Sequence, residues 1–305
     1  MAIPYTEAEA DELGTHVSRR HMFAWRYVED VYKHVGADGW KDVKEVWYKS
    51  GGTWRLVHEG EHFLFKTTLS TNAENQWSLS TYITGQGYTG NKIKGVVVVN
   101  NAQQRVNLNN YQNGSRILLV VNSGKKISGR GGNGGNASGG NGQNGQRALY
   151  SGGTPFKLNN AGVIAGGGGG GGAGNHGQCS YQTTQNVSCM KGQQCAQQQT
   201  QYSQSGGGGG GGGAGFPGGS GGTCPNTNPQ GGNGSGGSQT AGGGPGSAGG
   251  CGGATGGGKG GNLGQAGQNS GGNGGDKGWG VQGWNHKYGT YGSGDGDIRG
   301  GTTNT

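Results

Sequence analysis

The sequence is poor in the residues that build an ordinary core or a catalytic centre. Only 28% of its 305 residues are hydrophobic, and no apolar run approaches the 18 residues of a membrane-spanning helix. From residue 129 onward it has three aspartates and no glutamate. General acid and base catalysis needs placed carboxylates or histidines, so the sequence favours a protein that is not an enzyme.

The first residues also lack the features of a secretory signal. Met1 to Glu12 is acidic, without a basic or an apolar region, so we expect synthesis and solubility in a cytosol. The net charge of +8 is spread too thinly to form the basic stripe of a nucleic-acid-binding protein. We therefore expect neither nucleic acid nor membrane insertion, although this charge favours approach to an anionic bacterial surface.

Cysteine is absent from the first 128 residues. No C-x-x-C spacing occurs and His176 is the one nearby histidine, which argues against zinc; we expect no metal and no cofactor. Disulfides that staple long inserts suit an oxidising setting, and an odd count leaves one thiol over. The pairing stays open among the five candidates, which are Cys179, Cys189, Cys195, Cys224 and Cys251.

Glycine dominates the second half of the chain. Only 12 of the 80 glycines precede residue 129, and the longest runs are Gly166 to Gly172 and Gly206 to Gly213. A flexible linker is one interpretation. However, the runs have similar lengths, carry almost no charge and alternate with inserts of different composition. These features favour polyproline II helices whose backbones hydrogen-bond to neighbouring glycine helices. Collagen is rejected because consecutive glycines break its Gly-X-Y period.

Residues 6 to 35 are predicted to form one amphipathic helix. Thr6 and Glu9 suit a capping box, and Gly36 is a natural stop. Apolar residues recur at spacings of three, four and seven, and aromatic residues such as Phe23, Trp25 and Tyr27 widen the stripe. That stripe could pack in a core or dock onto a partner subunit.

Residues 41 to 128 are predicted to be rich in strands. A hairpin is expected around Ser50-Gly51-Gly52. Val98 to Ala102 resembles Val120 to Gly124 at an offset of 22 residues, which suggests stacked β-rungs. A related phrase at 160–165 leads directly into a glycine run, so we expect rungs to feed the glycine bundle. The strands expected are Val43 to Lys49, Thr53 to His58, Glu61 to Leu69, Gln76 to Thr84, Lys94 to Val99 and Arg116 to Asn122.

The inserts between glycine runs contain all nine aromatic residues that follow residue 129. These side chains could cap the ends of a bundle. Combined with Asn, Gln, Ser and Gly, they are also typical of recognition loops, and we expect recognition. The inserts are 146–164, 175–205, 216–230 and 276–299. The candidate receptor-binding residues are Tyr150, Phe156, Tyr181, Met190, Tyr202, Phe216, Trp279, Trp284, His286, Tyr288 and Tyr291.

With these features the chain resembles the tip adhesins of the long tail fibres of T-even-type bacteriophages. The resemblance covers residues 40 to 305 and rests on Trp47, on Gly51 to Arg55 with Trp54, and on the junctions 122–135 and 159–174. It implies a β-rich part at 41–128 that caps a trimeric fibre. It further implies a glycine-rich polyproline II (polyglycine II) sandwich at 129–305 with variable distal loops.

The predicted fold is thus mainly non-α: a small α+β attachment domain, then the glycine sandwich. Residues 1 to 40 would form a helix for fibre docking, with Phe23, Trp25, Tyr27, Trp47 and Trp54 as docking residues. The expected partners are the trimeric distal fibre subunit and a bacterial outer-membrane protein or lipopolysaccharide. The protein would be made in the host cytoplasm and act in the virion, at the fibre tip. A glycine-rich structural or ice-binding protein is the alternative, and a glycan depolymerase is the third hypothesis.

Overall fold

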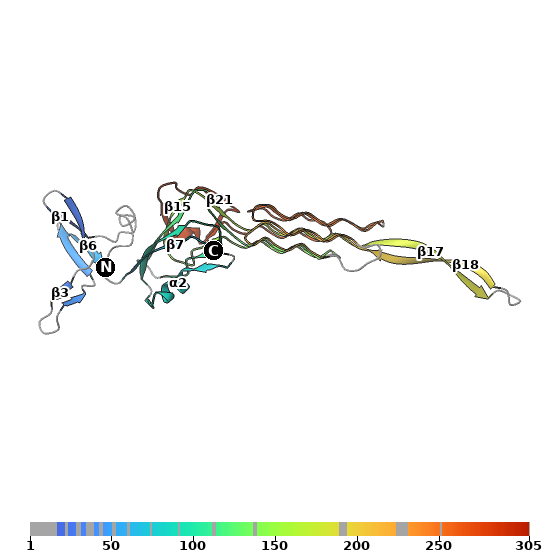
Figure 1. Ribbon diagram of the computed structural model, residues 1–305, viewed down its shortest axis with the longest axis horizontal. Coiled ribbons are helices and arrows are strands. Elements are labelled where there is room, and N and C mark those ends of the chain that lie inside the picture. Colours follow the sequence, from blue (N-terminus) through green and yellow to red (C-terminus); the bar gives the residue numbers. More distant parts are fainter. Residues whose placement is uncertain are drawn as a thin grey trace.

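The computed structural model describes residues 62–304 except 74, 91, 112–113, 137–138, 189–193, 224–230 and 251, and the backbones of six strands between residues 17 and 59. The described parts are arranged along one long axis (Figure 1). The amino-terminal strands lie at one end, a β-domain follows, a bundle of extended glycine runs comes next, and a two-stranded hairpin lies at the far end.

Three antiparallel pairs of strands precede the β-domain. The helix expected at residues 6–35 is wrong where the structure describes this stretch. Ala24 to Val28 contains two aromatic residues and a β-branched one, Trp25, Tyr27 and Val28, and such residues favour strands. Residues 1–16 lie outside the described part. The pairing of β5 with β6 confirms the predicted hairpin. The strands are β1 (Val17–His21), β2 (Ala24–Val28), β3 (Tyr32–His34), β4 (Trp40–Asp42), β5 (Glu45–Ser50) and β6 (Thr53–Glu59).

The β-domain is built from three sheets of parallel strands, which we call the β-prism. The first sheet contains β7 (Phe63–Leu69), β9 (Ile93–Val99), β12 (Arg116–Val121), β15 (Phe156–Asn160) and β20 (Lys287–Thr290). The second contains β10 (Gln103–Gln104), β13 (Lys126–Ser128), β16 (Val163–Ala165) and β21 (Asp297–Arg299). The third contains β8 (Trp77–Ser78), β11 (Val106–Asn107), β14 (Leu149–Tyr150), β19 (Val281–Gln282) and β22 (Thr302–Thr303).

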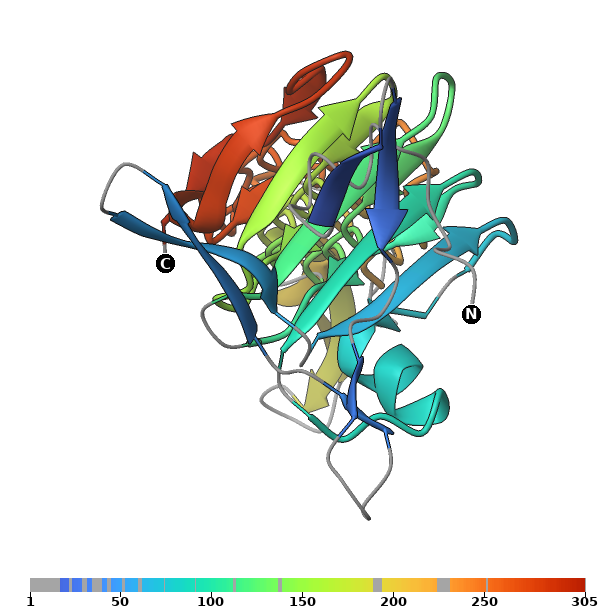
Figure 2. The same ribbon diagram turned by 90° about the vertical axis from the view of Figure 1, so that its left-hand side faces the viewer.

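The chain winds through the β-prism in rungs, each taking strands from the sheets in turn. Val98 pairs with Val120 and Val99 with Val121, so the predicted stacking at an offset of 22 is confirmed. Figure 2 shows the strands of the first sheet side by side, with the amino-terminal strands in front of it. Inward side chains such as Val97, Leu119 and Phe156 fill one continuous apolar core.

The strand predicted at Gln76 to Thr84 is confirmed only at Trp77 and Ser78 and is wrong from Leu79 onward. After β8 the chain forms the helix α2 (Leu79–Gly85). Leu79 and Ile83 are both buried, whereas Thr81 between them is exposed. A strand would place all three side chains on one face, so the polar Thr81 would be buried with them.

The glycine runs leave the β-prism at the corner between its second and third sheets. In the third rung residues 129–147 are inserted between β13 and β14; in the fourth, residues 166–280 are inserted between β16 and β19. The predicted order of strand, then glycine run, is confirmed. Because 149–165 and 281–303 return to the β-prism, the expected single glycine domain at 129–305 is corrected to insertions within a β-domain.

The glycine run 166–174 lies at the centre of one set of neighbours. Its N–H groups donate to three neighbouring segments in turn, with a period of three residues. Gly168, Gly171 and Gly174 donate to residues 208–214. The residue after each of the first two donates to 265–268, and the residue before each of the three donates to 140–146. Its carbonyl groups accept from runs 129–135, 258–264 and 272–278. Six neighbours therefore satisfy this backbone, as buried polar groups require.

A second run, 206–214, is surrounded in the same way. It donates to 132–135, 232–235 and 255–261 and accepts from 168–174, 219–222 and 243–249. The close approach depends on glycine: a Cβ on Gly170 would lie 1.9 Å from the carbonyl oxygen of Asn133, and one on Gly211 2.1 Å from that of Gly243. Real Cβ atoms do not approach backbone so closely, so a side chain would push two runs apart.

We expect Gly170→Ala to lower the free energy of unfolding by about 2 kcal/mol or more, because the methyl group overpacks a backbone that cannot retreat. Gly250→Ala is the matched control, since the bundle offers nothing within 4 Å of its Cβ; we expect a change within about 0.5 kcal/mol. Denaturant unfolding followed by circular dichroism measures both. Equal stability of the two variants would show that the runs are not closely packed.

Candidate functional site

A long hairpin projects from the end of the glycine bundle that is farther from the β-prism (Figure 1). It consists of β17 (Gly177–Ser188) and β18 (Gln194–Ser205), antiparallel from Gly177 opposite Ser205 to Ser188 opposite Gln194. Among the described strands these two pair only with each other. Both outer edges therefore offer backbone N–H and C=O groups to a partner.

The side chains of this hairpin are mostly polar and exposed on both faces. Tyr181 is 47% and Tyr202 70% exposed. Tyr181 pairs with Gln201, and its hydroxyl donates to Gln201 Oε1 at 2.9 Å. Tyr202 pairs with Ser180, so the two tyrosines lie on opposite faces of the hairpin. Each face thus presents one aromatic ring within glutamine, serine and threonine side chains.

Hydrogen bonds at its base join the hairpin to the bundle. The N–H of Asn175 donates to Thr255 Oγ1 at 2.8 Å, and that of Gln178 donates to the carbonyl of Gly252 at 3.2 Å. His176 Nδ1 accepts from the N–H of Gly207 at 3.1 Å. Because an isolated two-stranded hairpin is only marginally stable, this anchoring is what holds the strands in place.

A disulfide starts near the base of the hairpin. Cys179, near the start of β17, is disulfide-bonded, which confirms for this residue the predicted stapling of an insert. Cys189, Cys224 and Cys251 lie outside the described residues, as does the side chain of Cys195. The register of the hairpin places Cys195 opposite Val187, far from Cys179, so the partner of Cys179 stays a prediction among Cys189, Cys224 and Cys251.

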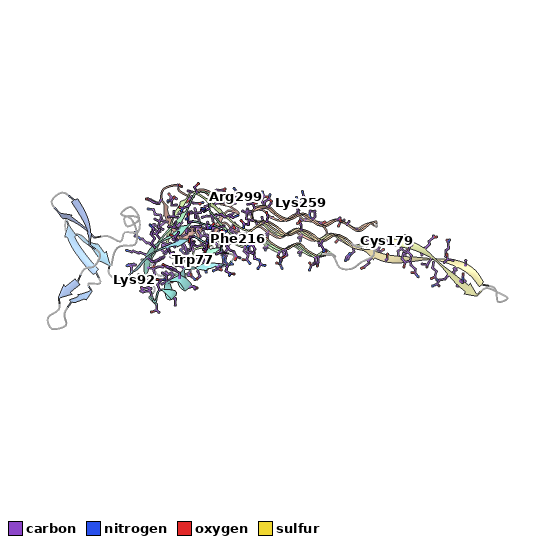
Figure 3. The ribbon with its side chains drawn as sticks, in the orientation of Figure 1. Trp77, Lys92, Cys179, Phe216, Lys259 and Arg299 are labelled. Carbon is purple, nitrogen blue, oxygen red and sulfur yellow. The ribbon has the colours of Figure 1, made fainter. Side chains whose placement is uncertain are left out.

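The structure does not bring the predicted receptor-binding residues together. Figure 3 places Phe216 near the β-prism and Cys179 at the far hairpin. Phe156 belongs to the core of the β-prism and is fully buried, and Phe216 is only 5% exposed. These two assignments are wrong, because neither ring can reach a receptor. Met190 lies outside the described residues.

The other candidates lie on the β-prism. Tyr150 is half-buried in β14, and Trp279 is 44% exposed where the last glycine run ends. Trp284 and His286 form a short 3-10 helix, η3 (Trp284–His286), which Tyr288 and Tyr291 follow. Apart from the two hairpin tyrosines, none of the described candidates lies at the far end.

Electrostatic contacts fix this last rung of the β-prism. Lys287 Nζ lies 2.5 Å from Asp295 Oδ1 and 4.5 Å from the centre of the Trp284 ring. Burial raises the pKa of Tyr288 to about 12, partly opposed by the positive charge of Arg116. Packing and ion pairing thus hold this rung in place.

The predicted docking residues lie mostly in the amino-terminal strands. Trp25 and Tyr27 are in β2, Trp47 in β5 and Trp54 in β6, where only the backbone is described; Phe23 lies outside the described residues. Their docking role stays a prediction.

The described part of the chain contains no group of three His, Cys, Asp or Glu side chains that could hold a metal ion. Within the same residues no helix has the length and apolarity needed to cross a membrane.

The sequence did not reveal that residues 177–205 form two paired strands. A signal was present: Thr, Tyr, Val and Gln alternate around Cys179 and Cys195 without a glycine between Gly177 and Lys191. No sequence feature predicts that the edges of the hairpin are exposed, because this exposure depends on how far the hairpin projects from the bundle.

One family model and one solved structure are similar to this chain. The family model of the phage tail fibre adhesin Gp38 matches residues 64–303. Among solved structures, the gp37–gp38 adhesin tip complex of the bacteriophage S16 long tail fibre is similar, with a TM-score of 0.44 and 21% identity over 74% of this chain and 77% of that one. A comparison with curated proteins gave no match.

We expect Cys179→Ser to release one new reactive thiol, because the sulfur that Cys179 holds in the disulfide becomes free. Alkylation of the denatured, unreduced protein followed by mass spectrometry counts the thiols, and peptide mapping identifies the new one. The matched control is the wild-type chain under the same conditions. An unchanged count would mean that Cys179 is not bridged in solution.

Proposed function

Since this chain belongs to the family of the phage tail fibre adhesin Gp38, we propose that it attaches a phage to its host through the far hairpin, β17 with β18. The observation that carries this proposal is the position of the hairpin at the end of the long axis, with exposed side chains on both faces. Membership of the family makes the protein a host-attachment adhesin of the tail fibre; the contact residues are the proposal.

The length of the molecule supports contact at the hairpin. A nine-residue glycine run such as 166–174 spans about 28 Å as a polyproline II helix. Twelve strand residues add about 40 Å. A receptor on a cell surface would therefore meet the hairpin long before the β-prism.

The glycine bundle is proposed to be a polyglycine II sandwich. Two observations support it. Donors rotate among three neighbours with a period of three residues, as in a helix with three residues per turn. The described glycines with positive φ do not include any of 166–174 or 206–214, so these runs keep the negative φ of that helix.

Such a bundle would make binding by a long hairpin less costly in entropy. A flexible chain loses freedom when it binds, whereas a hairpin anchored at Asn175 and Gln178 has lost much of that freedom on folding. The receptor is proposed to be an outer-membrane protein or lipopolysaccharide of the host.

The opposite end is proposed to attach to the trimeric distal subunit of the long tail fibre. Val96 and Leu118 alternate with inward residues of the first sheet and so face outward, yet both are fully buried. The amino-terminal strands lie in front of this sheet (Figure 2). An apolar outer face on the side of the β-prism away from the hairpin suits an attachment surface.

We expect Tyr181→Ser with Tyr202→Ser to reduce binding to a sensitive Gram-negative strain at least tenfold, because exposed aromatic rings supply much of a recognition surface. The measurement is the binding of labelled protein to intact cells of a strain panel. Tyr288→Ser is the matched control, since Tyr288 is also an exposed tyrosine but lies on the β-prism. Loss in the control alone, or in neither variant, would exclude the hairpin as the contact.

We expect deletion of residues 1–59 to abolish co-purification with the distal fibre subunit while cell binding by the hairpin persists, because the β-prism begins only at Phe63. Deletion of residues 1–40 alone tests the part first expected to dock. Circular dichroism and cell binding control for folding of the remainder. Normal assembly of both truncated proteins would show that the fibre binds elsewhere.

A further inference from the structure

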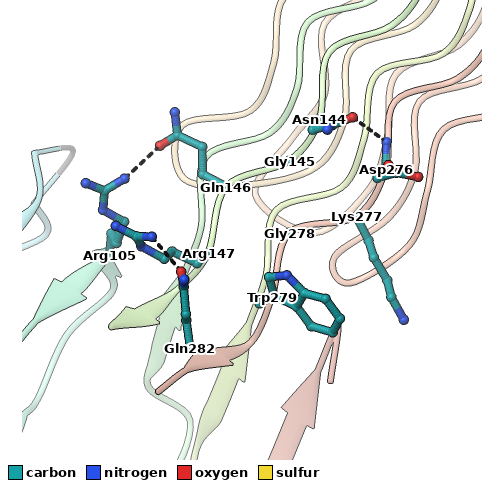
Figure 4. A pocket seen from close by; sticks show the side chains of 10 residues that line it. All are labelled: Arg105, Asn144, Gly145, Gln146, Arg147, Asp276, Lys277, Gly278, Trp279 and Gln282. Carbon is teal, nitrogen blue, oxygen red and sulfur yellow. Dashed lines mark hydrogen bonds between the residues drawn. The ribbon is translucent and has the colours of Figure 1, made fainter. Parts of the chain in front are cut away.

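A groove of about 640 Å³ lies where the glycine insertions meet the β-prism (Figure 4). It goes beyond the proposed function, because it lies at the other end of the bundle from the hairpin. Three cationic side chains line it, those of Arg105, Arg147 and Lys277, with one carboxylate, that of Asp276. The half-exposed indole of Trp279 forms part of the wall.

The two guanidinium groups are held by neutral partners. Arg147 donates from Nη1 to Gln282 Oε1 at 2.5 Å, and its Cζ lies 4.1 Å from the centre of the Tyr150 ring. Arg105 donates to the side-chain oxygens of Gln146 and Gln76. Amide oxygens fix these groups without neutralising their charge. Within the described residues neither arginine pairs with a carboxylate.

The two guanidinium groups also lack some of their hydrogen bonds. The Nε atoms of both Arg105 and Arg147 are buried without a hydrogen-bond partner among the described residues. Burial, and then the charge of Arg147, lowers the pKa of Arg105 from its usual value. Bringing two like charges together at a partly buried place is unfavourable, and an anion between them would remove that cost.

Different segments of the chain build the groove, and one of them is strained. Arg147 ends the first glycine insertion and Trp279 ends the second; the N–H of Ala148 donates to the carbonyl of Trp279 at 2.9 Å. Arg105 is the single residue between β10 and β11, with φ of 41°. A non-glycine residue at positive φ is uncommon, and such strain gathers at binding sites.

We propose that this groove binds a saccharide that carries an anionic group. The guanidinium groups of Arg105 and Arg147 would hold a carboxylate or phosphate, for which the arginine fork is suited. Lys277 lines the same groove on the other side of Trp279 and adds positive charge there (Figure 4). The indole of Trp279 offers a flat apolar surface to a sugar ring. The amide side chains can donate to hydroxyl groups, and the Asp276 carboxylate can accept from them. An inorganic anion alone would leave the indole without a role.

Isothermal titration of the full chain with defined probes tests the ligand class. A glucuronic acid and N-acetylglucosamine hexasaccharide carries carboxylates, glucose 6-phosphate carries a phosphate, and maltohexaose is the neutral control. We expect binding of at least one anionic sugar, weaker at high salt, and none of maltohexaose. Which anionic sugar binds identifies the source of the charge.

Variants test the residues. We expect Arg105→Gln with Arg147→Gln to weaken binding about tenfold or more, and Lys277→Gln about threefold, since each removes a charge from the ligand site. Lys259→Gln is the matched control, because Lys259 is an exposed lysine of the bundle outside the groove. Lys277→Gln also covers the case in which the double variant does not fold.

Four results would overturn the proposal. They are no binding of either anionic sugar, equal affinity of Lys259→Gln and Lys277→Gln, binding of inorganic phosphate alone, and tighter binding of adenosine 5′-phosphate than of glucose 6-phosphate. The last would indicate a nucleotide site instead. Because all probes are soluble, failure here is distinct from failure of cell attachment by the hairpin.

Discussion

The structure depends on one constraint: backbone N–H and C=O groups that are buried must find partners, and in the glycine runs they find them on neighbouring backbones. The distances leave no room for a side chain, as Gly170 and Gly211 show. An ordinary core is held by apolar side chains, whereas this bundle is held by hydrogen bonds between extended chains. It therefore needs neither hydrophobic composition nor charge, which explains a sequence poor in both.

The β-prism supplies what glycine cannot, namely a fixed register. A glycine run could slide along its neighbour by three residues and make the same kind of bonds. The parallel strands prevent this, because β13 and β16 start the runs at one corner and β14 and β19 receive them again. The apolar core around Leu119 and Phe156 holds those strands in place. The side-chain core thus determines how the backbone-bonded bundle aligns.

Sequence reasoning succeeded where periodicity was strong and failed where context decided. The offset of 22 and the entry of strands into glycine runs were predicted, because both are local patterns that the register confirms. The helix expected at 6–35 failed in its described part, β1 to β3, because β-branched and aromatic residues such as Val17, Trp25 and Tyr27 favoured strands there. Phe156 was taken for a loop residue because a buried strand of five residues and an aromatic insert look alike in sequence.

The groove could not be predicted from the sequence for a related reason. Arg105, Arg147 and Lys277 are far apart along the chain, and only the return of both insertions to one corner brings them together. The same topology separates the two candidate binding surfaces by the length of the bundle, about 28 Å for nine residues, with the hairpin beyond it. A hairpin that meets a receptor close to the membrane would leave the groove farther out. The two proposed surfaces do not overlap, so a ligand in the groove need not displace a receptor from the hairpin.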